Sequence, residues 1–287
     1  MSSSIPSPTD TAAWDSLSST ILASLTAAGA LDPPAESLGQ DVKLSAREMA
    51  QLIDHTLLKT DATKEQVQVL CEEARAEEFK TVCVRLGFVE QAVAALKGSG
   101  VGVACVVGFH EGTYSTEEKV AEAKAAVTAG ASELDIVLNW PLLLASPPST
   151  NAILADLRAL RAAAPLPTAL KLIFETSQLS PQQIVAATAL AAAARFDCVK
   201  TSTGFCGRGA SVQDVRLMKG TLGALQAMGG EWEGAGDMFV KASGGVRSVP
   251  ELRRVVAVGA GRIGTSSGVK IVKEARGEGV EGPAQGY

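Results

Sequence analysis

The sequence has few of the residues that metal sites and disulfide frameworks need. Its 287 residues include two histidines, five cysteines and, among aromatics, three Trp, two Tyr and seven Phe. The cysteines are odd in number and form no CxxC pair, which favours reduced thiols. A histidine-based zinc site would need both histidines plus carboxylates or thiols, so no metal and no cofactor are expected. The five cysteines are Cys71, Cys83, Cys105, Cys198 and Cys206.

Long apolar runs and early basic residues are also missing. The longest strongly apolar stretch, 184–194, is well short of the roughly 20 residues that cross a bilayer. No Lys or Arg precedes Lys43, whereas secretory signals and transit peptides need early basic residues. A formal net charge of -5 leaves no basic surface for nucleic acid or an anionic membrane. We therefore expect a cytoplasmic protein whose partner is neither nucleic acid nor a membrane.

Composition changes along the chain and divides it into three parts. Residues 1–46 are rich in Ser, Ala, Thr and Pro, with one weakly amphipathic stretch at 12–28, and are predicted to be a helical or irregular extension, partly disordered. Residues 47–275 alternate short apolar runs with helix-period segments and are predicted to be the main domain. Residues 276–287 are predicted to be a flexible tail.

Strand and helix patterns alternate regularly along the main domain, as in an α/β barrel. Eight strand candidates follow one another at intervals of about 30 residues, which suits a strand plus a crossover helix. Capping boxes are expected at 63–66, 115–118, 180–183 and 248–251. Together they predict a single (β/α)8 TIM barrel; the alternative, a doubly wound sheet, lacks a GxGxxG after its first strand. The strands are expected to start near Leu52, Thr81, Val103, Glu133, Ala169, Cys198, Phe239 and Arg262.

Three lysines lie in the predicted strands five, six and seven, close to where catalysis occurs in barrels. Lys171, Lys200 and Lys241 could each snorkel to the barrel mouth or pair with a carboxylate such as Asp135 or Glu175. However, two ammonium groups about 6 Å apart repel by about 3 kcal/mol at an effective dielectric of 20, or roughly two pKa units.

That repulsion, with partial desolvation, would turn one lysine into a neutral amine that attacks carbonyl groups. The protonated imine then formed is an electron sink, and this is the chemistry of a Schiff-base aldolase. A carboxylate with water must move the protons, and Asp135 is the best-placed candidate. The alternative is that Asp135 only pairs with a buried lysine.

Small-residue loops follow the late strands. Glycines let backbone amides approach an anion and serines donate hydrogen bonds, so these loops predict a phosphate cradle. The alternative is that the glycine pairs only turn each strand into the next helix. The candidate residues are Gly204 after strand six, Gly244, Gly245, Val246 and Arg247 after strand seven, and Gly264, Ser266 and Ser267 after strand eight.

Five ordered motifs resemble those of the deoxyribose-phosphate aldolases, class I aldolases on a (β/α)8 barrel. They are IDHTLLK at 53–59, ELDIV at 133–137, VKTSTGF at 199–205, VKASGGVR at 240–247 and RIGTSSG at 262–268. The resemblance covers about residues 48–275.

The resemblance implies a role for each matched residue. Lys200 would form the Schiff base, Lys241 would perturb its pKa, and Asp135 would relay protons with water. Some members of the family end in a tyrosine that assists proton transfer, as Tyr287 would do here. Asp54, Thr56 and Thr203 would place water or substrate hydroxyls, with Lys171 in the polar shell around them.

The implied reaction is reversible cleavage of 2-deoxy-D-ribose 5-phosphate to acetaldehyde and D-glyceraldehyde 3-phosphate, without a metal. The implied partners are a small phosphosugar and aldehydes, and relatives are commonly homodimers. Alternatives are another Schiff-base phosphosugar aldolase or transaldolase, and a phosphosugar-binding barrel without activity. Three departures are visible: His110 stands where many relatives have proline, the segment 228–234 is longer than usual, and the first 46 residues extend beyond the common core.

Overall fold

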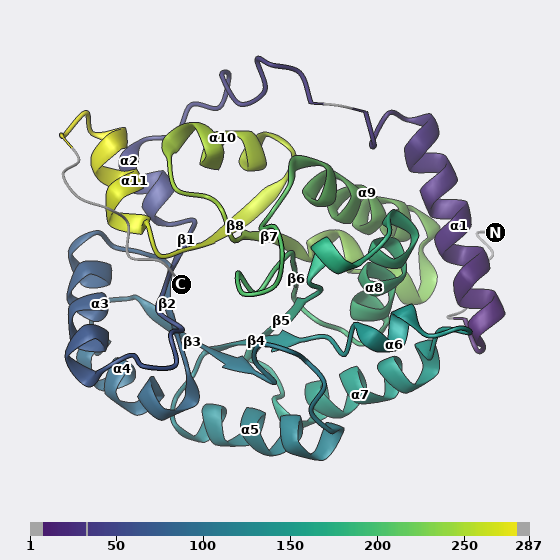
Figure 1. The fold of residues 1–287 in the computed structure, drawn as a ribbon, viewed down its shortest axis with the longest axis horizontal. Helices are drawn as coiled ribbons and strands as arrows, with labels where there is room; N and C mark the ends of the chain where they lie inside the picture. The colour runs from purple at the N-terminus through teal and green to yellow at the C-terminus, as the bar shows by residue number, and fades with distance from the viewer. Residues whose placement is uncertain (1–7, 33, 280–287) are drawn as a thin grey trace.

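The chain folds into a closed eight-stranded parallel barrel, which confirms the predicted (β/α)8 architecture (Figure 1). The computed structural model describes residues 8–32 and 34–279. Neighbouring strands pair in sequence order, and β1 closes the barrel against β8. The strands are β1 (Ile53–Thr56), β2 (Thr81–Val84), β3 (Gly102–Val107), β4 (Glu133–Val137), β5 (Ala169–Ile173), β6 (Cys198–Lys200), β7 (Phe239–Ser243) and β8 (Ala260–Thr265).

Helices surround the barrel, as Figure 1 shows. They are α1 (Thr11–Ala27), α2 (Ala46–Ala50), α3 (Lys64–Ala76), α4 (Val89–Leu96), α5 (Thr116–Thr128), α6 (Pro141–Leu144), α7 (Thr150–Ala163), α8 (Pro181–Ala193), α9 (Val212–Met228), α10 (Val249–Ala257) and α11 (Gly268–Ala275). Four short 3-10 turns are η1 (Leu86–Phe88), η2 (Thr176–Gln178), η3 (Gly230–Trp232) and η4 (Ala235–Asp237). Within the described residues no helix is long and apolar enough to cross a membrane.

Seven strands begin within one residue of the predicted position. The exception is β8, which begins at Ala260 rather than at Arg262. Ala260 pairs with Val240 of β7, and this pairing extends the strand by two residues. The spacing of apolar runs in the sequence therefore predicted the starts of the strands to within two residues.

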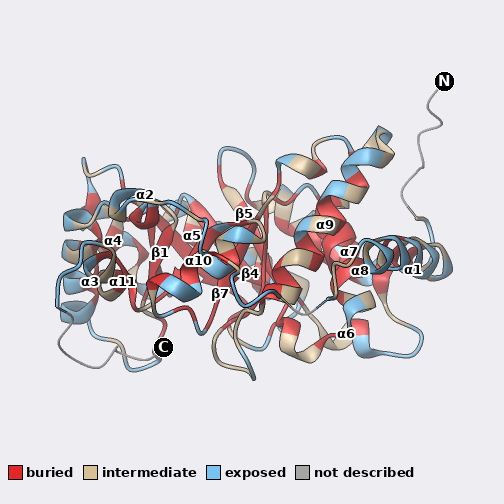
Figure 2. Ribbon diagram, turned by 90° about the horizontal axis from the view of Figure 1, so that it is seen from above, coloured by how far each residue is buried: buried red, intermediate tan, exposed pale blue. Residues whose placement is uncertain are grey.

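Side chains along each strand alternate between the barrel interior and the helix layer. In β4, Leu134 and Ile136 belong to the large apolar cluster beneath the helices, whereas Val137 belongs to a small cluster with Ile173 inside the barrel. Figure 2 shows that the strands and the inner faces of the helices carry the buried residues. By the same alternation, Glu133 and Asp135 of β4 point inward with Val137.

Three of the four predicted capping boxes are complete, at Thr63, Ser115 and Ser180. The fourth is only half formed. Ser248 accepts a hydrogen bond from the backbone N–H of Glu251, but the Glu251 carboxylate accepts from the backbone N–H of Arg247 instead of returning to Ser248. The predicted capping box at 248–251 was therefore wrong in one of its two hydrogen bonds, the one from the backbone N–H of Ser248 to the Glu251 carboxylate.

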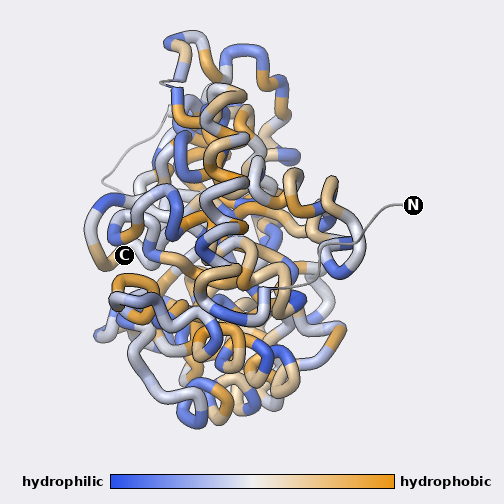
Figure 3. Tube along the Cα trace, turned by 90° about the vertical axis from the view of Figure 1, so that its right-hand side faces the viewer, coloured by the Kyte–Doolittle hydropathy of each residue, from blue (hydrophilic) through white to orange (hydrophobic). Residues whose placement is uncertain are grey.

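The extension helix α1 packs on α8 and α9, on the face seen in Figure 3. Trp14 is buried and meets Trp232 of η3 edge to face, with ring centroids 6.4 Å apart. Leu25 lies over Gly220 of α9, where a Cβ would approach Leu25 Cδ2 to 2.9 Å. This cover explains why every residue of α8 from Ile184 to Ala192 is buried. It also brings the extension against the long 228–234 segment.

Because Trp14 joins α1 to the barrel, Trp14→Ala should lower the free energy of unfolding by about 3 kcal/mol. Urea unfolding followed by circular dichroism measures the change. Ser16→Ala, at an exposed position of the same helix, is the control and should shift stability by less than about 0.5 kcal/mol. Equal midpoints for the two variants would contradict the packing role of Trp14.

Candidate active site

Seven charged side chains project into the barrel interior and form one connected cluster. Each comes from an inward position on a different strand, except that β4 contributes two. All are buried, although an isolated buried charge is costly unless it is paired. They are Asp54, Glu133, Asp135, Lys171, Lys200, Lys241 and Arg262.

Asp135 lies at the centre of the cluster. Its Oδ2 accepts from Lys200 Nζ at 2.7 Å and from Lys241 Nζ at 2.7 Å, while its Oδ1 accepts from Lys171 Nζ at 2.5 Å. Since Lys200 and Lys241 touch the same oxygen, their nitrogens lie no more than twice that distance apart. The structure thus brings together the three lysines and the aspartate that the sequence singled out.

Two further carboxylates hold the other side of the cluster. Asp54 accepts from Lys241 Nζ and from Arg262 Nη1, the latter at 2.8 Å. Glu133 lies 2.6 Å from Lys171 Nζ and 3.0 Å from Arg262 Nη1. The cluster therefore holds four cationic side chains and three carboxylates.

The carboxylates keep two of the lysines charged. Burial disfavours the ammonium of Lys241, but Asp135 and Asp54 outweigh burial and raise the pKa of Lys241. Burial likewise opposes the charge of Lys171. The carboxylates of Asp135, Asp54 and Glu133 outweigh burial and raise the pKa of Lys171 well above the usual range.

The same contacts hold the two aspartates in the ionised form. Burial alone would raise the pKa of Asp135, yet the three lysine ammonium groups lower it well below its ordinary value. Burial would also raise the pKa of Asp54. The positive charges of Lys241, Lys171 and Arg262 reverse this effect and lower the pKa. A lasting positive charge at Lys241 therefore lies close to Lys200.

Glu175 takes another position, directly after β5. Its backbone is left-handed (φ 59°), and its Oε2 accepts from the N–H of Thr203 at 3.2 Å and from the Thr203 hydroxyl. Its buried Oε1 has no partner in the described part of the chain. Burial raises the pKa of Glu175, against the opposing effect of the Thr203 hydrogen bonds and Lys200. Glu175 does not pair with a lysine, contrary to one of the alternatives considered above.

The candidate threonines make local contacts. Thr56 donates its hydroxyl to the backbone oxygen of Asp54 at 2.9 Å. Thr203 donates to Glu175 and accepts from the N–H of Phe205 at 3.0 Å. Both are buried beside the charged cluster, so their roles toward water or substrate stay predictions.

The loops after β6 and β7 lie against one another, whereas Gly264, predicted to follow strand eight, lies within β8. Gly244 has φ 80°, and a Cβ there would come within 2.9 Å of Gly209 Cα and 3.7 Å of Gly204 Cα. A Cβ on Gly264 would meet Lys241 Cε at 3.0 Å. These two glycines thus permit close approach, and Gly264 makes room for Lys241.

The other loop candidates differ in exposure. Gly245 and Arg247 are exposed, whereas Val246 is buried and its carbonyl accepts from Thr265 Oγ1 at 2.7 Å. Ser266 is half-buried. Ser267 precedes α11 as its N-cap, and its buried hydroxyl has no partner in the described part of the chain. A hydroxyl in this position can donate to a bound anion.

Sequence reasoning missed Glu133 and Arg262. The signal was available, because Glu133 precedes Asp135 by two residues and Arg262 precedes Gly264 by two, the spacing of a shared inward face. Tyr287 lies outside the described residues. Among residues 8–32 and 34–279 no group of three or more His, Cys, Asp and Glu side chains is placed to hold a metal ion.

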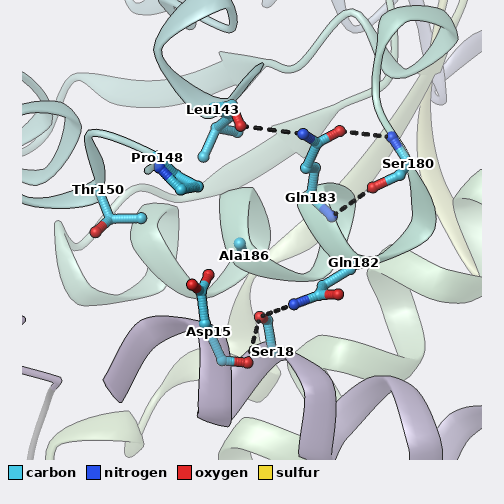
Figure 4. A pocket seen from close by; sticks show the side chains of 9 residues that line it. All are labelled: Asp15, Ser18, Leu143, Pro148, Thr150, Ser180, Gln182, Gln183 and Ala186. Carbon is cyan, nitrogen blue, oxygen red and sulfur yellow. Dashed lines mark hydrogen bonds between the residues drawn. The ribbon is translucent and has the colours of Figure 1, made fainter. Parts of the chain in front are cut away.

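A cavity of about 210 Å³ lies elsewhere, between α1 and the start of α7 and α8. Figure 4 shows its lining, in which Asp15 is the one ionisable side chain and Gln183 donates to the Leu143 carbonyl at 3.0 Å. The rest of the lining consists of hydroxyl, amide and apolar side chains, the last from Leu143, Pro148 and Ala186. The cavity lacks the amine and paired carboxylates of the barrel interior, so the candidate chemistry belongs to the barrel.

Fold and cluster together define a (β/α)8-barrel enzyme with amine groups held against carboxylates near the strand ends. Residues 48–274 match the family model of the DeoC/LacD family aldolases. The chain belongs to this family. It is a lyase and groups with the deoxyribose-phosphate aldolases.

The relatives agree in sequence and structure. A deoxyribose-phosphate aldolase of Coccidioides immitis (strain RS) is 49% identical over 228 residues, which cover 79% of this chain and 81% of the relative. One from Desulfitobacterium hafniense (strain DSM 10664 / DCB-2) is 42% identical over 78% of this chain and 97% of the relative.

Two solved structures extend the comparison. A Coccidioides immitis protein assigned to these aldolases superposes with a TM-score of 0.82 at 44% identity, covering 96% of this chain and all of that one. The deoxyribose phosphate aldolase of Aeropyrum pernix, a tetramer, gives a TM-score of 0.72 at 29% identity over 85% of this chain and 99% of that one. The homodimer expected for the present chain stays a prediction.

The raised pKa of Glu175 predicts a pH-dependent contribution to stability. The folded protein holds this proton more tightly than the unfolded chain, so the contribution is present at acid pH and is lost as the pH rises above the ordinary value of 4.5. Glu175→Gln cannot ionise. The free energy of unfolding of this variant, relative to that of the unmodified protein, should therefore increase from acid to neutral pH in urea titrations; a constant or falling difference would contradict the assignment.

Proposed function

We propose that this protein reversibly cleaves 2-deoxy-D-ribose 5-phosphate to acetaldehyde and D-glyceraldehyde 3-phosphate, through a Schiff base on Lys200. The observation that carries the proposal is the unequal pairing of the lysines. Lys171 and Lys241 each contact two or more carboxylates, whereas Lys200 contacts Asp135 alone, at an oxygen that Lys241 also occupies. Lys200 thus has the fewest carboxylate partners of the three lysines, and we assign the nucleophilic amine to it.

The first stage forms the imine. The neutral amine of Lys200 attacks the aldehyde carbon of the open-chain sugar, and the carbonyl oxygen takes a proton to give a carbinolamine. Loss of water then gives the iminium. Asp135, which touches the reacting nitrogen, holds the ammonium and passes protons to and from water.

The second stage breaks the carbon–carbon bond. A base removes the proton of the hydroxyl on the third carbon, the bond between the second and third carbons breaks, and its electron pair moves to the iminium nitrogen. Glyceraldehyde 3-phosphate leaves, and an enamine remains on Lys200. Protonation of the enamine carbon and hydrolysis by water then release acetaldehyde and the free amine.

Lys241 has an electrostatic role in this proposal. Its charge, fixed by Asp54 and Asp135, disfavours a second charge on Lys200 nearby. Asp54 therefore acts on the reaction by holding Lys241. Lys171 fixes the other oxygen of Asp135 and so orients the carboxylate toward Lys200.

The phosphate group would lie at the loops after β6, β7 and β8. Backbone amides near Gly204, Gly244, Gly245 and Gly264, with the hydroxyls of Ser266 and Ser267, form the proposed cradle. Arg247 is exposed beside it and adds a positive charge. The carboxyl-terminal Tyr287 is proposed to assist protonation of the enamine.

The test of the reaction is a product assay with 2-deoxyribose 5-phosphate. Acetaldehyde and glyceraldehyde 3-phosphate should appear in equal amounts, and Lys200→Met should reduce the rate by at least about a thousandfold because it removes the nucleophile. Lys124→Met, at an exposed position of α5, is the matched control and should retain the rate. Turnover by Lys200→Met at the original rate would refute the mechanism, and the absence of both products with the unmodified protein would refute the reaction.

The phosphate assignment predicts a selective defect in Ser266→Asp. A new negative charge in the cradle should lower kcat/KM for 2-deoxyribose 5-phosphate by about tenfold or more, since two anions a few ångströms apart repel. Cleavage of unphosphorylated 2-deoxyribose should change little, and Ser266→Asn controls for size. An equal loss with both sugars would place the phosphate elsewhere.

A further inference from the structure

Two charged side chains beneath the lysines have no part in the bond-making steps above. Glu133 is the first residue of β4, and Arg262 lies in β8 two residues before Gly264. Glu133 is 9% exposed and Arg262 is 7% exposed. Neither has a contact with Lys200 among the ion pairs of the described chain, so their influence on Lys200 is that of charges acting at a distance.

These two side chains close a ring of alternating charges. Arg262 binds Asp54, Asp54 binds Lys241, and Lys241 binds Asp135. Asp135 in turn binds Lys171, Lys171 binds Glu133, and Glu133 returns to Arg262 at 3.0 Å. Lys171 Nζ also lies 3.7 Å from Asp54 Oδ2, so this longer contact crosses the ring, and Glu133 and Arg262 form the part of the ring beyond it.

The charge count of the ring singles out Lys200. Three cations and three carboxylates alternate around the ring and balance one another. Lys200 is attached to the ring from outside, through Asp135 Oδ2, and its ammonium gives the cluster one uncompensated positive charge. Removal of any one ring charge must therefore change how readily Lys200 keeps its proton.

We propose that Glu133 and Arg262 are positioning residues that set the net charge of this ring, and thereby the fraction of Lys200 that is a free amine at neutral pH. The inference rests on the proposed role of Lys200 as the nucleophile. It assigns a function to the lowest charged layer of the barrel, which touches neither the substrate nor the reacting nitrogen in the proposed mechanism.

Other titratable groups near Lys200 do not replace the ring in this role. Burial raises the pKa of the Cys83 thiol to about 11 and raises that of Cys198, so both are neutral at neutral pH. Glu175 has a raised pKa and its hydrogen bonds go to Thr203. The groups that face Lys200 or its partners are Asp54 from β1, Cys83 from β2, Glu133 and Asp135 from β4, Lys171 from β5, Glu175 after β5, Cys198 from β6, Lys241 from β7 and Arg262 from β8.

The charge count predicts opposite effects of two neutralising variants. Glu133→Gln adds one net positive charge, so the pH at which Lys200 becomes a free amine should fall by about one unit or more. Arg262→Gln removes one positive charge, and that pH should rise by a similar amount. The double variant Glu133→Gln/Arg262→Gln restores the original net charge of the cluster. The pH at which Lys200 becomes a free amine should therefore return close to its value in the unmodified protein.

The experiment measures the amine directly. The full chain is treated with formaldehyde and cyanoborohydride across neutral and alkaline pH, and peptide mass spectrometry follows methylation of Lys200, with exposed Lys124 as the internal reference. This readout does not need sugar cleavage, so the ring can be tested even if the proposed reaction fails. Opposite shifts in the single variants and recovery in the double variant support the proposal. Unshifted profiles, shifts in one direction, or no methylation of Lys200 in the unmodified protein overturn it.

Charge-preserving variants separate charge from packing. Glu133→Asp and Arg262→Lys keep the sign of each group and should leave the Lys200 profile near that of the unmodified protein. If Arg262→Gln does not fold, as judged by circular dichroism, the pair Glu133→Gln and Glu133→Asp decides the question alone. A shift of equal size in these two variants would mean that packing, not charge, controls Lys200.

Discussion

The shared carboxylate of Asp135 is the interaction on which the rest of the site depends. Three ammonium groups converge on its two oxygens, and two of them, from Lys200 and Lys241, occupy the same oxygen. Such a cluster is stable in a buried site only when each charge is matched by others. The second carboxylate contact of Lys241 and of Lys171 provides that match, and Lys200 is left with a single shared partner.

The barrel makes this cluster possible because it directs alternate side chains of eight strands toward one axis. β4 supplies two carboxylates two residues apart, while β5, β6 and β7 each supply one lysine. Gly264 matters for the same reason, since a Cβ there would come within 2.9 Å of Ser243 Cβ and 3.0 Å of Lys241 Cε. The fold thus sets the distances between charges, and the charges set which lysine can react.

Much of the fold and part of the site could be predicted from the sequence. Strand spacing and capping residues are signals in the sequence, so they predicted the barrel. The apolar strands also drew attention to the charged residues within them, Lys200, Lys241 and Asp135. The spacing of Glu133 and Arg262 marks both as inward residues, but their ion pairs depend on contacts between β4, β5, β8 and β1, which the spacing along each strand does not encode. The pairing of Trp14 with Trp232 is also nonlocal. The hydrogen bond from the Arg247 N–H to Glu251 is local, but the Ser-x-x-Glu pattern does not distinguish it from a return to Ser248.

The central claim is that Lys200 is the lysine that becomes a nucleophile. Its most direct test is to incubate the protein with 2-deoxyribose 5-phosphate and borohydride, which reduces an imine to a stable amine, and to locate the adduct by peptide mass spectrometry. The adduct is expected on Lys200. An adduct on Lys171 or Lys241 instead, or no adduct on any lysine, would contradict this claim.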